Sequence, residues 1–200
     1  MSLLAGTLRL GSEFPASRPE PVAGQRQGRW IHGPLAVDWD LPAFTPEAER
    51  ETLPLLSSNG RWQLFYSGRV DNRSDLIDRY GCPMAATDGE LLLAALLRDG
   101  AGGWRHVVGD FVVVAWDCDR RTLWLARDAL GHRPLFYALD SHRVAWSTRL
   151  GDLRRRVDTH AIDIGFLAEC LTGAPASVAE RNPGRKKPVW RAAARRRGPG

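Results

Sequence analysis

The chain contains 200 residues, of which 44% are hydrophobic and 26% are charged. This is the composition of one globular domain with a sizeable core, and it excludes a disordered chain. The sequence contains no apolar run long enough for a membrane span and no signal peptide at its N-terminus, so we expect a cytoplasmic protein. Cys82, Cys118 and Cys170 are scattered without metal-ligand spacing and predict neither a zinc site nor a disulfide framework.

The basic charge is concentrated at the C-terminus. Residues 181–200 hold 8 of the 28 Lys and Arg and no acidic residue, which leaves residues 1–180 with 20 basic against 23 acidic residues. We therefore expect a domain over residues 1–180 and a basic, disordered tail over residues 181–200. Binding of nucleic acid through this tail is an alternative from another functional class. Because Trp190 is its only aromatic residue and no recognition fold surrounds it, we do not expect nucleic acid as a partner.

The first part of the chain predicts strands joined by loops. Ser2–Leu10 predicts an N-terminal strand, and a loop rich in Pro, Ser and Gly follows. Trp30–Val37 predicts a strand that is interrupted at Gly33-Pro34. Pro46–Glu49 can open a short helix, and Trp62–Val70 has the β-branched and aromatic content of a longer strand.

Two helices are expected after this strand. Asn72 can cap a helix over Arg73–Tyr80 through its side chain. Thr87 and Glu90 have the spacing of a capping box, which predicts a second helix that ends at Gly100.

The later part of the chain is organised around one apolar run. Gly102–His106 predicts a flexible link into Phe111–Trp116, whose successive apolar residues favour a central strand covered on both faces. A polar turn then leads to Leu123–Ala126, the expected antiparallel partner, and Arg127–Pro134 forms a corner. The remaining predicted elements are two strands, at Leu135–Tyr137 and Arg143–Ser147, and two helices, at Leu150–Arg155 and after Asp158-Thr159.

Three segments of this region resemble a known family. GDFVVVAWD, LWLARDALGHRPLFY and VAWSTRLGDLRR follow one another with the order and spacing of motifs in the glutaminase domain of asparagine synthetases. The D-N-R-x-D-L phrase at Asp71–Leu76 resembles members that form β-lactams or cyclise lasso peptides and lack the N-terminal Cys. The resemblance implies a class II glutamine amidotransferase domain with the α+β, four-layer αββα sandwich of N-terminal-nucleophile hydrolases. A two-layer α+β domain is the alternative.

The resemblance also implies where the site lies. In the family, removal of Met exposes a Cys nucleophile whose own α-amino group is the base, and Ser2 stands at that position here. Ser67 stands where the family has an Asn whose amide, with the N–H of the next residue, here Gly68, binds the oxyanion. Arg69 replaces a carboxylate near the amino group of the substrate, and Asp88 matches the aspartate that binds this amino group.

These departures predict a domain that does not hydrolyse glutamine. Serine is a weaker nucleophile than cysteine near neutral pH, and Ser67 is too short to replace the amide. Arg29 is the nearest residue by position to the family's carboxylate-binding arginine, and a solvated loop arginine is the simpler interpretation. An active glutaminase with Ser2 as nucleophile is the alternative, and only then do we expect glutamine as a ligand.

The resemblance implies partners as well. The family's synthetase domain binds ATP through an S-G-G-x-D-S loop and adenylates a carboxylate, and this chain has no such loop. We therefore expect no cofactor and no metal in this chain, ATP and Mg being used by a separate synthetase domain or protein. Because the family pattern stops at Glu180, the basic tail suggests a truncated product of a shifted reading frame. The expected function is that of a glutaminase-like domain of an asparagine-synthase-like, ATP-dependent amidoligase that forms asparagine or a peptide or lactam amide.

Overall fold

The computed structural model describes residues 2–15, 27–40, 48–157 and 189–193, which form two antiparallel sheets, three α-helices and two 3-10 helices. One sheet contains β1 (Leu3–Arg9), β2 (Gln27–His32), β3 (Leu35–Asp40), β8 (Phe136–Leu139) and β9 (Arg143–Ser147). The other contains β4 (Leu55–Leu56), β5 (Trp62–Val70), β6 (Gly109–Asp117), β7 (Thr122–Arg127) and β10 (Val189–Ala193). The helices are α1 (Arg73–Tyr80), α2 (Asp88–Asp99), α3 (Leu150–Val157), η1 (Ala48–Arg50) and η2 (Gly100–His106).

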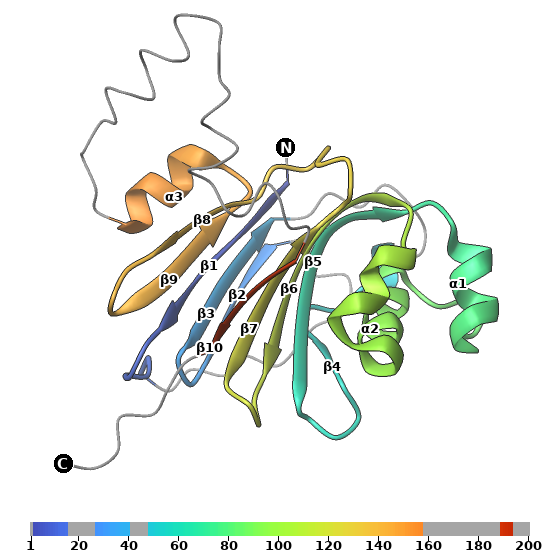
Figure 1. Ribbon diagram of the computed structural model, residues 1–200, viewed down its shortest axis with the longest axis horizontal. Helices are drawn as coiled ribbons and strands as arrows, with labels where there is room; N and C mark the ends of the chain where they lie inside the picture. The colour runs from blue at the N-terminus through green and yellow to red at the C-terminus, as the bar shows by residue number, and fades with distance from the viewer. Residues whose placement is uncertain (1, 16–26, 41–47, 158–188, 194–200) are drawn as a thin grey trace, which may run out of the picture.

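The two sheets stack face to face between layers of helix (Figure 1). The strand orders are β2-β3-β1-β9-β8 in the first sheet and β10-β7-β6-β5-β4 in the second. α3 packs on β9 and β8 of the first sheet, whereas α2 packs on β5 of the second and carries α1 beside it. The predicted four-layer sandwich is therefore confirmed, and the two-layer alternative is wrong.

The central strand of the second sheet is β6, as its sequence predicts. It pairs with β5 on one side and β7 on the other, and every residue from Phe111 to Asp117 is buried. A strand covered by the first sheet on one face and by α2 on the other must be apolar at successive positions, and this one is.

Contacts between aromatic side chains and their partners join the two sheets. The rings of Trp39 on β3 and Phe65 on β5 lie 5.9 Å apart, and the indole N–H of Trp30 on β2 donates to Gln63 Oε1 on β5 at 3.0 Å. Phe65 and Gln63 are two positions apart, so the alternate residues of β5 in this row face the first sheet. Ser67 continues the row toward the end of the strand.

The local sequence signals hold for the helices, with one difference. Thr87 Oγ1 accepts from the Glu90 N–H while the Glu90 side chain accepts from the Thr87 N–H, so the capping box is confirmed. Asn72 precedes α1 as predicted, but its side chain does not cap this helix. It instead donates to the His106 carbonyl at 3.0 Å and accepts from the Val108 N–H at 2.9 Å, because the chain entering β6 presents both groups to it.

Two other predictions need correction. The glycine and proline at 33 and 34 do not interrupt one strand but form the turn of the β2–β3 hairpin, with Gly33 at φ +56°. Residues 102–106 are not a flexible link: they belong to η2, because the buried Trp104 anchors this segment by donating to the Leu92 carbonyl at 3.0 Å. Within the predicted tail, Val189–Ala193 pairs with the edge of β7 as β10. The predicted helix after residue 158 and the rest of the tail lie outside the described residues.

Among the described residues, no helix is long and apolar enough to cross a membrane.

Candidate active site at the start of β1

The N-terminus of the described chain is fixed between β3 and β9. Thr148, directly after β9, accepts from the Leu4 N–H through its Oγ1 at 3.1 Å and donates to the Leu4 carbonyl through its own N–H at 3.0 Å. The same hydroxyl donates to the Ser2 carbonyl at 3.3 Å. Ser2 is therefore held one residue before β1, at one end of the sandwich, with its side chain half-buried.

Ser67 meets Ser2 from the opposite sheet. It lies near the end of β5, is 1% exposed, and donates from Oγ to Ser2 Oγ at 2.8 Å. The alternation of β5 directs Ser67 toward the first sheet, as it does Phe65 two positions earlier. Two residues 65 positions apart in sequence are thus brought into direct contact.

A third residue, Arg133, completes this contact. Its Nη1 donates to Ser2 Oγ at 2.7 Å and to Ser67 Oγ at 3.2 Å, and its Nε donates to the Asp110 carbonyl at 3.1 Å. The Ser2 hydroxyl oxygen therefore accepts two hydrogen bonds, one of them from a cation. We call Ser2, Ser67 and Arg133 the serine–arginine cluster.

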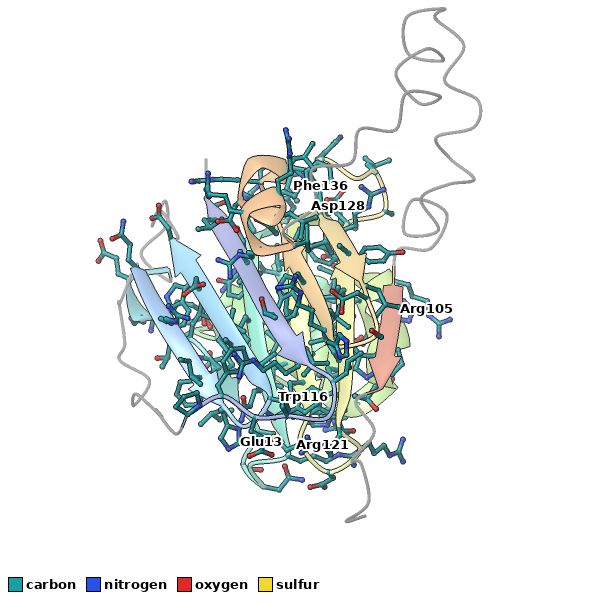
Figure 2. The ribbon with its side chains drawn as sticks, turned by 90° about the vertical axis from the view of Figure 1, so that its left-hand side faces the viewer. Glu13, Arg105, Trp116, Arg121, Asp128 and Phe136 are labelled. Carbon is teal, nitrogen blue, oxygen red and sulfur yellow. The ribbon has the colours of Figure 1, made fainter. Side chains whose placement is uncertain are left out.

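The corner between β7 and β8 aims Arg133 at the serines. Asp128 is 3% exposed, and its carboxylate accepts from the His132 N–H at 2.9 Å and the Arg133 N–H at 3.2 Å. Its own N–H donates to the Phe111 carbonyl at 2.9 Å, and its carbonyl accepts from the Gly131 N–H at 3.1 Å. Figure 2 shows Asp128 at the end of the sandwich opposite Arg121. The R-D-x-x-G-x-x-P pattern thus describes a turn that buries its aspartate and projects its second arginine.

Gly68 lies beside the cluster and is required by packing. Its φ is +142°, and a Cβ at this position would lie 2.0 Å from the Asp110 carbonyl oxygen. This oxygen accepts from Arg133 Nε, so the missing side chain lets β5 approach β6 and leaves the carbonyl available to the arginine.

Arg69 points away from the cluster. Its side chain is 65% exposed, its Nε lies 3.0 Å from Asp71 Oδ1, and its Nη2 lies 3.7 Å from Asp110 Oδ2. Asp110 also bonds His132 Nδ1 at 2.9 Å, and this hydrogen bond, supported by the charge of Arg69, lowers the pKa of the Asp110 carboxyl. Arg69 therefore belongs to a surface network of charges next to the cluster.

Asp88 is held by other partners. Its Oδ2 accepts from the Val70 N–H at 2.9 Å, and its Oδ1 forms an ion pair with Arg73. Its side chain is 14% exposed. Within the described part of the chain, neither Ser2 nor Ser67 is among its hydrogen-bond or ion-pair partners. Arg29 lies on β2, is 63% exposed and faces Asp38 at 3.5 Å.

The cluster can stabilise negative charge. A guanidinium and two hydroxyls converge within hydrogen-bonding distance of one another, and all three can donate to an oxyanion. Within residues 2–15, 27–40 and 48–157, no group of three or more His, Cys, Asp or Glu could hold a metal ion.

The sequence does not predict Arg133 as a site residue. It predicts Arg69 and Asp88, but within the described residues neither of them contacts Ser2. The signal for Arg133 was present in the corner pattern, where a buried aspartate precedes an arginine by five positions. The sequence alone does not indicate that Arg133 lies next to Ser2 and Ser67, because this contact depends on the conformation of the corner.

Comparisons with known proteins agree with this architecture. A glutamine amidotransferase domain family model matches residues 43–155, a stretch that contains Ser67, Gly68 and Arg133 but begins after Ser2. Asparagine synthetase [glutamine-hydrolyzing] 2 of Bacillus subtilis is 26% identical over 102 residues, which are 50% of this chain and 14% of that protein.

Two solved structures share the fold. Glutamine phosphoribosylpyrophosphate amidotransferase from B. subtilis, complexed with ADP and GMP, is 16% identical with a TM-score of 0.50, covering 72% of this chain and 35% of that one. A structure described as the allosteric regulatory enzyme of purine biosynthesis is 13% identical with a TM-score of 0.53, covering 76% of this chain and 43% of that one. The chain thus spans less than half the length of each of these relatives. Because the family model covers more than half of the chain, the chain belongs to the glutamine amidotransferase domain family and is related to asparagine synthetase.

Proposed function

We propose that this domain is a glutaminase-like unit of an asparagine-synthetase-like amidoligase and does not itself release ammonia from glutamine. The observation that supports this most directly is the environment of the Ser2 hydroxyl. Its oxygen accepts from Arg133 at 2.7 Å and from Ser67 at 2.8 Å. Attack by a serine requires a base that takes the hydroxyl proton, and a guanidinium has no acceptor to offer, so the base would have to be the α-amino group that removal of Met1 exposes.

The oxyanion position supports the same proposal. The family uses an asparagine amide there, whereas Ser67 offers a shorter hydroxyl that already donates to Ser2. Loss of one oxyanion donor lowers turnover by roughly 10²–10³-fold in a working amidase. A weak nucleophile and a lost donor together leave little of the hydrolytic machinery.

The ligation step is proposed for a partner. The matched B. subtilis protein is named a glutamine-hydrolysing asparagine synthetase, and this chain covers 14% of it. We propose that a separate synthetase domain or protein binds ATP and Mg and forms the amide, while this domain contributes its fold and its altered site.

The test is ammonia release from L-glutamine by the purified chain, by Ser2→Ala and by Ser58→Ala, with the N-terminus of each defined by mass spectrometry. Ser58 is exposed and serves as the matched control. We expect the three proteins to release ammonia at the same background rate. Release by the wild type and by Ser58→Ala that is lost in Ser2→Ala would refute the proposal.

One contact favours the alternative of a Ser2-nucleophile glutaminase. Arg133 Nη1 lies close enough to Ser2 Oγ to stabilise an alkoxide, because a neighbouring cation favours the ionised form of an acid. The same assay decides between the two functions, since only the alternative predicts turnover that depends on Ser2.

A further inference from the structure

We infer that the serine–arginine cluster binds the carboxylate group of a small ligand. This inference rests on the proposed function, because a site that hydrolysed glutamine would hold an amide beside Ser2 instead.

Arg133 is a half-buried cation whose described partners are all neutral. They are the Asp110 carbonyl and the two serine hydroxyls. Two other half-buried arginines are paired with carboxylates: Arg61 lies 2.6 Å from Asp117, and Arg156 lies 2.8 Å from Asp38. A guanidinium taken partly out of water without a counter-ion is costly, and a bound anion would compensate it.

The nearby acidic side chains form no direct ion pair with Arg133 among the described residues, although the charge of Arg133 helps to lower the pKa of the Asp110 carboxyl. The Asp110 carboxylate is engaged by His132 and Arg69, and the Asp128 carboxylate accepts backbone N–H groups of the corner. Of the Arg133 guanidinium, Nε and Nη1 have partners, while Nη2 has none within the described part of the chain. The free edge of the guanidinium and the rotatable Ser2 hydroxyl can therefore donate to the same ligand.

A carboxylate fits this arrangement better than phosphate. One guanidinium with hydroxyl donors matches the single charge and the planar shape of a carboxylate. A phosphate dianion would bring a second negative charge next to the Asp110 and Asp128 carboxylates of the same corner. His132 and Arg69 partly neutralise the Asp110 carboxylate, but both carboxylates oppose further negative charge.

The test is a titration of the ¹⁵N-labelled full chain with sodium acetate, followed by NMR through the Arg133 side-chain Nε–H and the amides of the corner. Sodium chloride at equal ionic strength and sodium phosphate are run in parallel. We expect saturable shifts with acetate that chloride does not produce. Arg133→Gln should weaken acetate binding by about tenfold or more, as expected for the loss of a charge-assisted hydrogen bond.

Arg120→Gln is the matched control. Arg120 is exposed in the turn between β6 and β7, next to Arg121 at the opposite end of the sandwich, and its replacement removes the same charge (Figure 2). It should bind acetate as the wild type does. Arg133→Lys keeps the charge without the planar fork and should bind several-fold more weakly than the wild type, which provides a second reading if Arg133→Gln does not fold.

Three outcomes would overturn the inference: shifts that do not saturate, acetate affinity that survives both Arg133 substitutions, or phosphate binding that is tighter than acetate binding. The ammonia assay on the same samples separates this inference from the proposed function. Absence of ammonia release together with Arg133-independent acetate shifts refutes only the carboxylate site. Ser2-dependent ammonia release with Arg133-dependent acetate binding refutes only the proposed loss of hydrolysis.

Discussion

Two neighbouring residues of β5 lead to two different kinds of polar cluster. Tyr66 faces the helices and donates from its hydroxyl to Glu51 at 2.6 Å. Glu51 also accepts from the Thr87 hydroxyl at 2.9 Å and the Gly89 N–H at 3.2 Å. A Cβ at Gly89 would lie 2.7 Å from Glu51 Oε1, so α2 packs closely against the carboxyl group of this glutamate cluster.

Ser67, the next residue, faces the other sheet and meets a cluster of the opposite type. In the glutamate cluster, a buried carboxyl group is surrounded by donors from the protein itself. In the serine–arginine cluster, a half-buried cation contacts only neutral oxygens of the described chain. A polar group whose partners are complete stabilises the fold, whereas one whose charge is unmatched is available for a ligand.

Replacing Gly68, which follows Tyr66 and Ser67 on β5, should have the largest effect. Gly68→Ala places a Cβ 2.0 Å from the Asp110 carbonyl at a φ of +142°, so β5 must move away from β6 and carry both Tyr66 and Ser67 with it. We expect a loss of about 4 kcal/mol in the free energy of unfolding, or failure to fold, measured by urea denaturation.

Gly60→Ala is the control for this change. Gly60 also has a positive φ, +68°, but a Cβ there would meet nothing within 4 Å. Its cost should be limited to about 1 kcal/mol of backbone strain. If both variants lost the same free energy of unfolding, the close approach of β5 and β6 at Gly68 would not be under steric constraint.

Opening the glutamate cluster should have the next largest effect. Glu51→Ala leaves the Tyr66 hydroxyl, the Thr87 hydroxyl and the Gly89 N–H without their acceptor, in a site where Glu51 is 8% exposed. We expect a loss of about 3 kcal/mol in the free energy of unfolding. Glu49→Ala, in the same segment but exposed, should change it by less than about 0.5 kcal/mol. Equal values for both variants would mean that the cluster is not a stabilising unit.

The two clusters also differ in how far the sequence predicted them. The strands and the capping box follow from local patterns, and β5 has the predicted bounds of Trp62–Val70. Ser2 and Ser67 came from family motifs, and the fold brings them together. Arg133 could be assigned to its cluster only from the geometry of the corner. Glu51 could be assigned only by knowing which face of β5 packs against α2. These are contacts between distant elements, which periodicity does not contain.

The same limit explains the errors at the ends of elements. The cap at Asn72 failed because its amide bonds the chain entering β6, and β10 was not predicted because its pairing partner, the edge of β7, is distant in sequence. In each case a local preference lost to a partner supplied by tertiary structure. Residues that act through such partners cannot be assigned from composition or spacing alone.

The pH dependence of stability should distinguish the clusters by sign. Burial raises the pKa of the Glu51 carboxyl above its ordinary 4.5, although its hydrogen bonds, led by that from Tyr66, oppose the shift. The folded state then holds the proton more tightly than the unfolded chain. The contribution of Glu51 to stability is therefore fully present below pH 4.5 and is lost as the pH rises through the raised pKa.

Asp110, beside the serine–arginine cluster, should act in the opposite direction and more weakly, since it is nearer the surface. Its hydrogen bond to His132 lowers its pKa below 3.8, so its contribution is present above pH 3.8 and is lost as the pH falls through the lowered value. Urea unfolding from about pH 3 to about pH 8 tests both signs. Glu51→Gln should remove the decline on the alkaline side. Asp110→Asn should reduce the loss on the acid side, to which the lowered pKa values of Asp117, Asp140 and Asp152 also contribute. If Glu51→Gln left the alkaline decline unchanged, Glu51 would be ionised in the folded state at neutral pH. The glutamate cluster would then hold a stable buried anion, and the two clusters would differ only in whether the protein supplies the opposing partners.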